Sequence, residues 1–436
     1  MTRKIFAILA LLLQVMCCDA EDVAYRGSFF QKLENGVSVV FVDTVRSNSL
    51  LVMLCISAGS ADELDREGVA NLLSHIFARK LKKNADVDSL QYGAESNFYT
   101  GHDYSLYYFY GKLENLEGFI KNLGDVFENF AFSRDDLDLS KRKIEEKITE
   151  ENQHDRFVLQ QESRKSIYWN SKYGIDVAGN LDHLKEISED DVHNFKSRNY
   201  TNNRVTVIIA GNVKKDEALG MIKKYFGDGK SVSKIDRLQE PSHHGSTTKI
   251  VKNSAQVSVP IVELYWRIPN YRSEEKKALA AEISINFLED ELRRKLIDEQ
   301  KIASSLSFNY SFWNYDYGDL SIAITFNSQK DVEELIAAVL AEIKYISFDG
   351  ITQEQANKAV KKMKFAANMF NGDMLDAVNW LAEKIGSGHK FGFIKEYPSF
   401  VEKYDLEEVN TQVKEIFKNE PHVISVLKPL EKKNAI

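Results

Sequence analysis

Few residues of this chain belong to the types that bind metals, and they are scattered. The chain has nine histidines and three cysteines in 436 residues. A catalytic zinc takes about three protein ligands and a structural zinc about four. Apart from His75, the isolated histidines form no cluster at the spacing of metal ligands; they are His102, His154, His183, His193, His389 and His422. These histidines therefore predict no metal centre.

The cysteines do not indicate nucleophilic or disulfide chemistry. Cys17 and Cys18 belong to the amino-terminal segment, and Cys55 stands inside the apolar run Leu50–Ile56. Such a run is typical of a buried strand, in which cysteine serves as a small apolar side chain. We predict that Cys55 lies in the core, and that the mature chain has no disulfide and is held together by packing alone.

The first twenty residues have the layout of a secretory signal. Thr2-Arg3-Lys4 is positive, Ile5–Met16 is almost entirely apolar, and Cys17–Ala20 leads into polar sequence. We predict a signal peptide at 1–20, so the protein is secreted, and periplasmic if its source is a Gram-negative bacterium. The apolar run is too short to span a bilayer comfortably, so stable membrane insertion is not expected. A short membrane anchor and a lipid-linked cysteine remain as alternatives.

The composition is that of an ordinary globular protein large enough for two domains. It is 43% hydrophobic and 28% charged, with a formal net charge of -8. No long run of lysine or arginine is present, so nucleic acid is not an expected partner.

Paired segments about 218 residues apart indicate two copies of one structural unit. Ser133 and Thr352 each stand at the start of a helical segment, in the position of an N-cap. Two other pairs of segments repeat at the same spacing; they are 187–192 with 404–409, and 203–209 with 421–427. We infer two homologous halves.

Each half is predicted to be α+β, with an antiparallel or mixed sheet backed by helices. Apolar runs or alternating patterns predict strands at Val37–Val42, Leu50–Ser57, Tyr104–Tyr110 and Asp319–Phe326. A polar, turn-rich stretch containing the solvated pair His243-His244 separates the halves. We predict domains at 26–235 and 249–430, joined by a linker at 236–248 and closing as a clam-shell.

Three stretches resemble the insulinase, pitrilysin and mitochondrial processing peptidase family of zinc metallopeptidases. Gly59–Glu63 with Gly68–His75 resembles the family's first helix region. Tyr92–Thr100 with Asp103–Ser105 resembles its Asn-Ala-Tyr-Thr segment and the following strand, and Asn199–Asn212 resembles its closing strand and turn. The likeness covers roughly Arg26–Leu430 and implies the family's two-part fold.

The family's chemistry depends on an H-x-x-E-H motif on that first helix. Two His at i and i+4 share one helix face and bind zinc, and the Glu is the general base that activates the metal-bound water. The matching positions here are Asn71, Ser74 and His75. An amide is a very poor zinc ligand, and a hydroxyl cannot take up a proton near neutral pH, so only His75 is retained.

The family's third ligand is a Glu on a later helix. The best register places Lys147 there, and a shift by one residue would place Glu146 instead. A cation would repel zinc, and with Glu146 the site would still have two ligands and no base. The resemblance therefore implies a degenerate site at Asn71, Ser74, His75 and Lys147, with no catalytic residue, no zinc and no other cofactor.

Some members of the family work in pairs, in which a partner without the motif completes a zinc-bearing chain. Such partners grip substrate through an Arg and a Tyr in their second half. The matching positions here are Ile297 and Ser304, so this pair is missing. Arg293 and Arg294 lie one turn earlier, and they are either partial substitutes or ordinary solvated helix charges.

A main-chain function survives the loss of catalytic side chains. In the family the substrate lies as an added strand on a sheet edge near the Asn-Ala-Tyr-Thr segment, and strand addition uses backbone groups. The resemblance points to Asn97 and Tyr99 as substrate-binding residues. The alternative is that these two residues only shape a turn.

Taken together, these features favour a secreted, non-catalytic subunit that pairs with an active zinc-bearing homologous peptidase and contacts extended peptides. A stand-alone peptide-binding or chaperone-like protein is the second hypothesis. The third is an active metalloendopeptidase with an atypical site.

Overall fold

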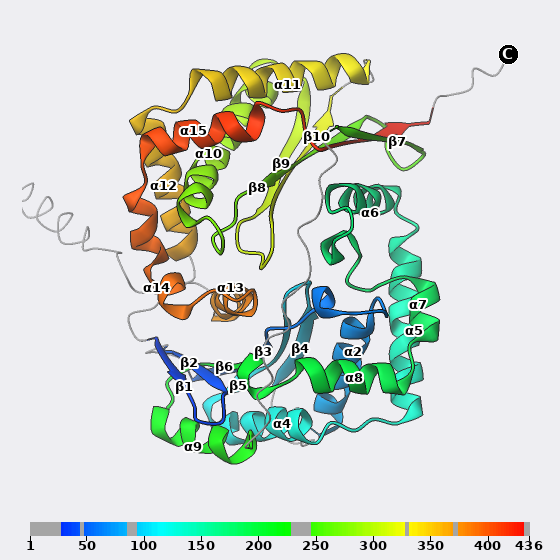
Figure 1. Ribbon diagram of the computed structural model, residues 1–436, viewed down its shortest axis with the longest axis vertical. Helices are drawn as coiled ribbons and strands as arrows, with labels where there is room; N and C mark the ends of the chain where they lie inside the picture. The colour runs from blue at the N-terminus through cyan, green and yellow to red at the C-terminus, as the bar shows by residue number, and fades with distance from the viewer. Residues whose placement is uncertain are drawn as a thin grey trace, which may run out of the picture.

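The computed structural model describes residues 28–43, 48–84, 94–227, 246–327, 331–368 and 374–430. The predicted signal peptide at 1–20 lies outside these residues, as does most of the predicted linker at 236–248 with its histidine pair. Two sheets, each backed by helices, occupy opposite ends of the molecule (Figure 1). The predicted fold class, α+β with two similarly built halves, is confirmed by this arrangement.

The first sheet has six strands in the order β1-β2-β6-β3-β5-β4. Their bounds are β1 Phe29–Lys32, β2 Ser38–Val42, β3 Ser49–Ile56, β4 Glu95–Thr100, β5 Ser105–Lys112 and β6 Val205–Ala210. Neighbouring strands are antiparallel, except that β2 runs parallel to β6. Within the described chain β4 pairs with β5 alone, so β4 forms an edge of the sheet.

The second sheet repeats this plan with five strands in the order β7-β11-β8-β10-β9. Their bounds are β7 Thr248–Ser254, β8 Ile261–Ile268, β9 Ala303–Ser311, β10 Gly318–Phe326 and β11 Val423–Pro429. Strand β11 runs parallel to β7, and the other neighbours are antiparallel. The edge strand β9 therefore occupies the place that β4 has in the first sheet. The strands expected around 37–42, 50–57, 104–110 and 319–326 are confirmed.

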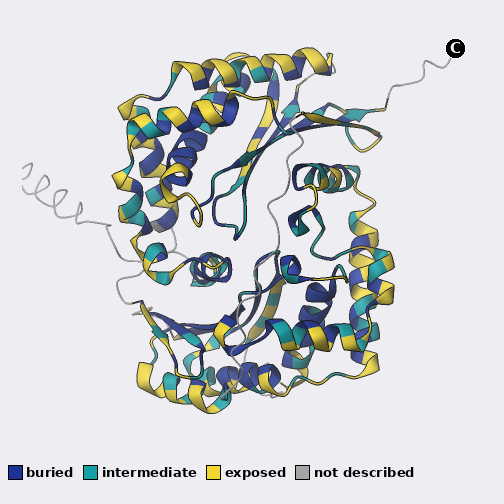
Figure 2. Ribbon diagram, in the orientation of Figure 1, coloured by how far each residue is buried: buried dark blue, intermediate teal, exposed yellow. Residues whose placement is uncertain are grey.

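Helices cover the outer face of each sheet. On the first sheet they are α2 Val69–Asn84, α4 Leu116–Glu128, α5 Arg134–Glu151, α7 Leu181–Glu186, α8 Glu189–Asn199 and α9 Lys215–Tyr225. On the second they are α10 Glu275–Arg293, α11 Val332–Asp349 and α15 Leu406–Phe417, with α12 Gln353–Asn368 packed on α10, while α14 Phe391–Phe400 packs on α12 and on α13 Met374–Gly386. Their exposed residues form the outer surface in Figure 2. Within the described residues, no helix is both long enough and apolar enough to cross a membrane.

Three of the sequence-based predictions about individual residues are confirmed. Ser133 caps α5, because its Oγ accepts from the backbone N–H of Asp136 while the Asp136 carboxylate accepts from the N–H of Ser133. Thr352 caps α12 in the same way, with Gln355 as its partner. Cys55 is fully buried in β3.

Each half sends one helix across to the inner face of the other half's sheet. Helix α6, Asp155–Ile167, belongs to the first half but packs on β11, β7 and β8. Helix α13, Met374–Gly386, belongs to the second half but packs on β3 and β6. The two helices follow α5 and α12, which the repeat makes equivalent. Both lie between the sheets in Figure 1.

Helix α13 seals the inner face of the first sheet. Its Leu381, Ala382 and Ile385 share one core with inward-facing residues of the sheet; those of β3 are Leu51, Met53 and Cys55. The Sγ of Cys55 donates to the Ala382 carbonyl at 3.4 Å. Gly386 permits this approach, because a Cβ at this position would lie 2.5 Å from the Cβ of Tyr104.

Candidate functional site

Helix α2, which carries Asn71, Ser74 and His75, is fixed at both ends by buried carboxylates. Glu63 accepts hydrogen bonds from the backbone N–H groups of Gly68 and Ala70 at the start of the helix. Near the other end, Asp136 of α5 accepts from Arg79 at 2.8 Å and Lys83 at 2.6 Å. Helices α2 and α5 therefore have a defined relative position.

Ser74 is fully buried in a hydroxyl network. Its Oγ accepts from the Tyr107 hydroxyl at 2.8 Å and donates to the Ala70 carbonyl at 3.0 Å. Tyr107 also lies 2.7 Å from the hydroxyl of Tyr200. Tyr107 is on β5 and Tyr200 follows α8, so the network joins three elements. This position contains no group that takes up a proton near neutral pH.

His75 is half-buried between β4 and the lysines of α5. Its ring makes an edge contact with Phe98 of β4, at 4.9 Å between centroids. Burial, together with the charges of Lys147 and Lys143, lowers the pKa of His75 to about 4. The structure thus brings Lys147 into electrostatic range of His75, and the imidazole is neutral at pH 7.

The side chains around His75 do not fit a zinc ion. Asn71 lies one turn earlier on the helix and is buried. Lys147 is largely exposed and lies 3.7 Å from Glu151. A zinc site needs three or four donor groups, and the set Asn71, Ser74, His75 and Lys147 supplies one imidazole and one repelling cation. Among the described residues no three His, Cys, Asp or Glu side chains are grouped so as to hold a metal ion.

Asn97 and Tyr99 lie on the edge strand β4, next to α2 (Figure 1). Both are exposed, and the Oδ1 of Asn97 accepts from the N–H of Phe98 at 2.9 Å. Partial burial raises the pKa of Tyr99, and the charge of Glu383 raises it as well, whereas the charge of Arg164 opposes the rise. The two residues therefore belong to a strand with an open edge and not to a turn.

The positions matching the family's Arg and Tyr lie at the start of the other edge strand. Ile297 is in η5, a π-helical turn at Arg294–Glu299, and Ser304 is exposed on β9. Arg293 donates to the Leu306 carbonyl at 3.0 Å, and Arg294 to Glu291 at 2.6 Å. Both arginines are engaged locally.

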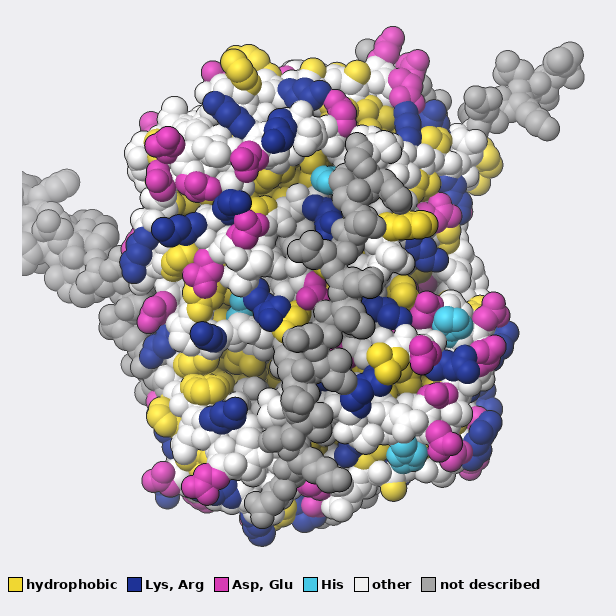
Figure 3. Space-filling view, in the orientation of Figure 1, with side chains coloured by type: hydrophobic (Ala, Val, Ile, Leu, Met, Phe, Trp, Pro, Cys, Tyr) yellow, Lys and Arg dark blue, Asp and Glu magenta, His cyan; other side chains and the backbone are white. Residues whose placement is uncertain are grey.

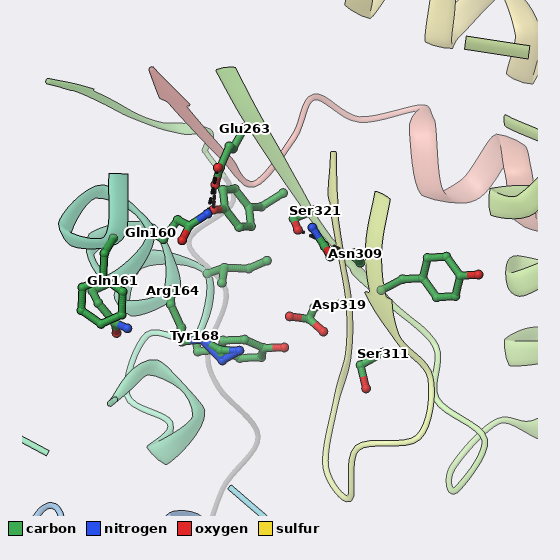
Figure 4. Close-up of a pocket in the computed structure, with 13 residues that line it drawn as sticks. Gln160, Gln161, Arg164, Tyr168, Glu263, Asn309, Ser311, Asp319 and Ser321 are labelled. Atoms are coloured by element: carbon green, nitrogen blue, oxygen red, sulfur yellow. Dashed lines mark hydrogen bonds between the residues drawn. The ribbon is translucent and has the colours of Figure 1, made fainter. Parts of the chain in front are cut away.

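A polar pocket that the sequence did not predict lies between α6 and the inner face of the second sheet (Figure 4). Its volume is about 340 Å³, and its walls include Arg164 of α6, Asp319 of β10 and Asn309 of β9. Nothing in the sequence distinguishes Arg164 from the many other charged residues, because α6 crosses to a sheet that is distant in sequence.

Comparison with known sequences places two adjoining parts of the chain in one family. Residues 38–180 match the family model described as Insulinase (Peptidase family M16), and residues 186–363 match the one described as Peptidase M16 inactive domain. The uncharacterized zinc protease YmxG of Bacillus subtilis is 21% identical over 414 residues, which are 91% of this chain and 97% of that protein. The mitochondrial-processing peptidase subunit beta of Homo sapiens is 25% identical over 248 residues, which are 55% and 50% of the two chains.

Solved structures share the fold at low sequence identity. A protease from Helicobacter pylori superposes with a TM-score of 0.80 at 18% identity, covering 92% of this chain and 99% of that chain. The periplasmic protease PqqL from Escherichia coli superposes with a TM-score of 0.77 at 17% identity. The match covers 94% of this chain but only 48% of the PqqL chain. Pitrilysin has a TM-score of 0.75 at 17% identity, with 95% and 46% covered.

Proposed function

Because this chain belongs to the insulinase family of peptidases, we propose that it is a secreted, non-catalytic member that binds extended peptides and pairs with an active, zinc-bearing homologue. The buried state of Ser74 carries this proposal. The position that would hold a general base is occupied by a hydroxyl tied to Tyr107 and the Ala70 carbonyl, so no proton acceptor is available there.

The pairing part of the proposal is supported by chain length. This chain covers about half of the PqqL and pitrilysin chains, so two units of its size match their extent, whereas it covers nearly all of YmxG and of the Helicobacter pylori protease. A partner that carries an intact zinc motif would supply the hydrolytic chemistry. This chain would then contribute a surface that binds substrate.

The peptide-binding part of the proposal is supported by the position of β4. Its free edge offers unpaired backbone N–H and C=O groups to an extended peptide, and it lies beside α2, where His75 contacts Phe98. A stand-alone peptide-binding protein is the second candidate. It is favoured by the exchange of α6 and α13, which joins the two halves into one body without a partner.

Association with the homologue tests the proposal most directly. The chain should form a stable complex with a zinc-bearing homologue from the same organism in size-exclusion chromatography. The complex should hydrolyse peptides faster than the homologue alone, and this chain alone should not hydrolyse them. If the two chains fail to associate at micromolar concentrations and the homologue is fully active by itself, the stand-alone protein becomes the better account.

Rebuilding the ligand set tests the reading of the degenerate site. The double variant Asn71→His with Ser74→Glu should not take up stoichiometric zinc, because Lys147 keeps a positive charge near the third-ligand position. Adding Lys147→Glu should raise zinc uptake, measured by metal analysis after dialysis. Glu146→Gln in the double variant is the control, and it should change nothing. One tightly bound zinc in the unaltered protein would contradict this reading.

A further inference from the structure

The rim of the polar pocket under α6 is electrically balanced. Glu263 of β8 is buried and accepts hydrogen bonds from Arg156 at 2.9 Å, Gln160 at 2.9 Å and Tyr265 at 2.5 Å. The bond from Gln160 is drawn in Figure 4. Glu263 and Arg156 thus form a neutral pair whose hydrogen-bonding capacity is used within the protein.

A second acid, Asp319, also lines the pocket and has cations near it. Asp319 of β10 is directly paired in register with Arg267 of β8 on one side and with Ser311 of β9 on the other. Burial raises the pKa of Asp319, and the charges of Arg164 and Arg267 act against that rise. Arg164 and, from the neighbouring strand, Arg267 therefore both oppose the negative charge of Asp319, Arg164 more strongly.

Arg164 is the remaining cation of the pocket. It is half-buried on α6, and its guanidinium lies 5.9 Å from the ring centroid of Tyr168. Within the part of the chain that the structure describes, this guanidinium has no ion pair and no hydrogen-bond acceptor. Glu263 is paired with Arg156, and the charge of Arg164 acts on Asp319 together with that of Arg267, so the N–H donors of Arg164 are the ones in the pocket that bond no acceptor among the described residues.

The geometry points to this pocket as a binding site for a peptide carboxylate, with Arg164 as its bidentate partner. A planar guanidinium presents paired N–H donors that match the two oxygens of a carboxylate. The hydroxyls of Ser311 and Ser321 and the amide of Asn309 line the same space and can bond the neighbouring peptide groups. A volume of about 340 Å³ suits the end of a peptide rather than a folded partner.

Arg164 of the pocket lies within electrostatic range of the end of β4. The charge of Arg164 acts on Tyr99 of β4 and on His102, which follows β4. An extended peptide on β4 would therefore have Arg164 within electrostatic range. This inference rests on the proposed peptide-binding function and adds to it the chemical group that is recognised, either a C-terminal carboxylate or an acidic side chain.

A short probe tests the pocket independently of strand addition. N-acetyl-Ala-Ala with a free carboxylate is too short to cover the six residues of β4, Glu95–Thr100. Titrated against the full chain and followed by the NMR signals of arginine Nε–H groups, it should bind at least about tenfold more tightly than its C-terminal amide. Arg164→Gln should abolish this preference. Lys165→Gln, an exposed neighbour on the same helix, should retain it.

A second variant, expected to strengthen binding, distinguishes a loss of binding from a loss of folding. Asp319→Asn removes the negative charge from the pocket and should tighten binding of the free acid while leaving binding of the amide unchanged. Equal binding of acid and amide by the unaltered protein, or a preference for the acid that survives in Arg164→Gln, would overturn the inference. Failure of the free-acid probe to bind the unaltered protein would also overturn it.

Longer labelled peptides identify the source of the carboxylate and separate the two proposals. A twelve-residue peptide is compared as free acid, as amide, and as amide with one internal Gln→Glu change. A higher affinity of the Gln→Glu amide than of the plain amide would assign an acidic side chain, and a higher affinity of the free acid than of the amide would assign a C-terminus. If the twelve-residue peptides bind no better than the short probe, strand addition at β4 fails while the pocket stands.

Discussion

The inner faces of the two sheets have the same topology but opposite chemistry. The first sheet turns apolar residues such as Met53, Cys55 and Ile208 inward, and α13 packs on them in a continuous core. The second turns Glu263, Ser321 and Asp319 inward, and α6 covers them only in part, leaving the polar pocket. Duplication of one unit has thus produced one inner face that is closed by packing and one that retains space for a ligand.

The largest expected loss of stability comes from disrupting the apolar contact between α13 and the first sheet. Leu381→Ala in α13 should lower the free energy of unfolding by about 4 kcal/mol, because Leu381 is fully buried in the shared core. Leu159→Ala in α6 should cost only about 2 kcal/mol, because Leu159 is buried beside a polar face. Urea denaturation measures both changes. Equal losses would show that the two inner faces do not differ energetically.

The reactivity of the Cys55 thiol also measures how tightly α13 packs on the first sheet. Burial raises its pKa to about 12, so it should not react with alkylating reagents while α13 is in place. Peptide mapping by mass spectrometry should show faster alkylation of Cys55 in Leu381→Ala than in the unaltered protein. Leu64→Ala, at an exposed position, serves as the control and should change neither alkylation nor stability by more than about 0.5 kcal/mol.

A smaller effect is expected from the histidine that anchors the end of α13. Burial is the main cause that lowers the pKa of His389 to about 4; a 2.8 Å hydrogen bond to the Trp313 carbonyl opposes the shift, and the charges of Lys384 and Arg272 add to it. Since the folded-state pKa is below the ordinary value, its contribution to stability is present above about pH 6.5 and is lost as the pH falls toward 4.

His389→Gln should remove this dependence. Between pH 7 and pH 4.5 the unaltered protein should lose about 2 kcal/mol more of its free energy of unfolding than the variant loses. His75 and His102 also have a pKa lowered to about 4, but their contributions are common to both proteins and cancel in the difference. Identical pH profiles would exclude His389 as a source of acid sensitivity.

The smallest effect belongs to the polar side. Arg156→Ala removes one of three donors to Glu263 and should cost about 1 kcal/mol, because Arg156 is half-exposed and Gln160 and Tyr265 remain. Lys165→Ala is the matched control on the same helix and should be neutral. A loss as large as that of Leu381→Ala would mean that α6 is held by its ion pair and not by packing.

Local signals were sufficient to predict much of the fold. The alternation of side chains in 104–110 predicted a strand because Leu106 and Tyr107 face opposite sides of the sheet. Ser133 and Thr352, together with the residues that follow them, predicted the starts of two helices. These patterns depend on neighbours a few residues away. Periodicity also indicates which residues of a helix are buried, but it does not say against which sheet, so the crossing of α6 and α13 was not predicted.

The candidate site shows the same limit. The substitutions at Asn71 and Ser74 could be read from spacing and resemblance. The contacts of Ser74 could not, because Tyr107 lies 33 residues away and Tyr200 is farther still. Arg164 was missed for a similar reason, since its surroundings come from strands β8, β9 and β10. The predicted domain boundaries and the predicted roles of the site residues stay predictions.

The exchange of α6 and α13 also has a consequence in time. The first sheet is complete in sequence at Ala210, but the helix that covers its inner face ends at Gly386. At a synthesis rate of about 5–20 residues per second, that apolar face waits for on the order of ten seconds or longer before its cover emerges from the ribosome. A fragment that stops at the linker would never receive it and would expose a sheet face suited to aggregation. The nascent first half therefore depends on a chaperone, or on delayed folding, until the second half has been made.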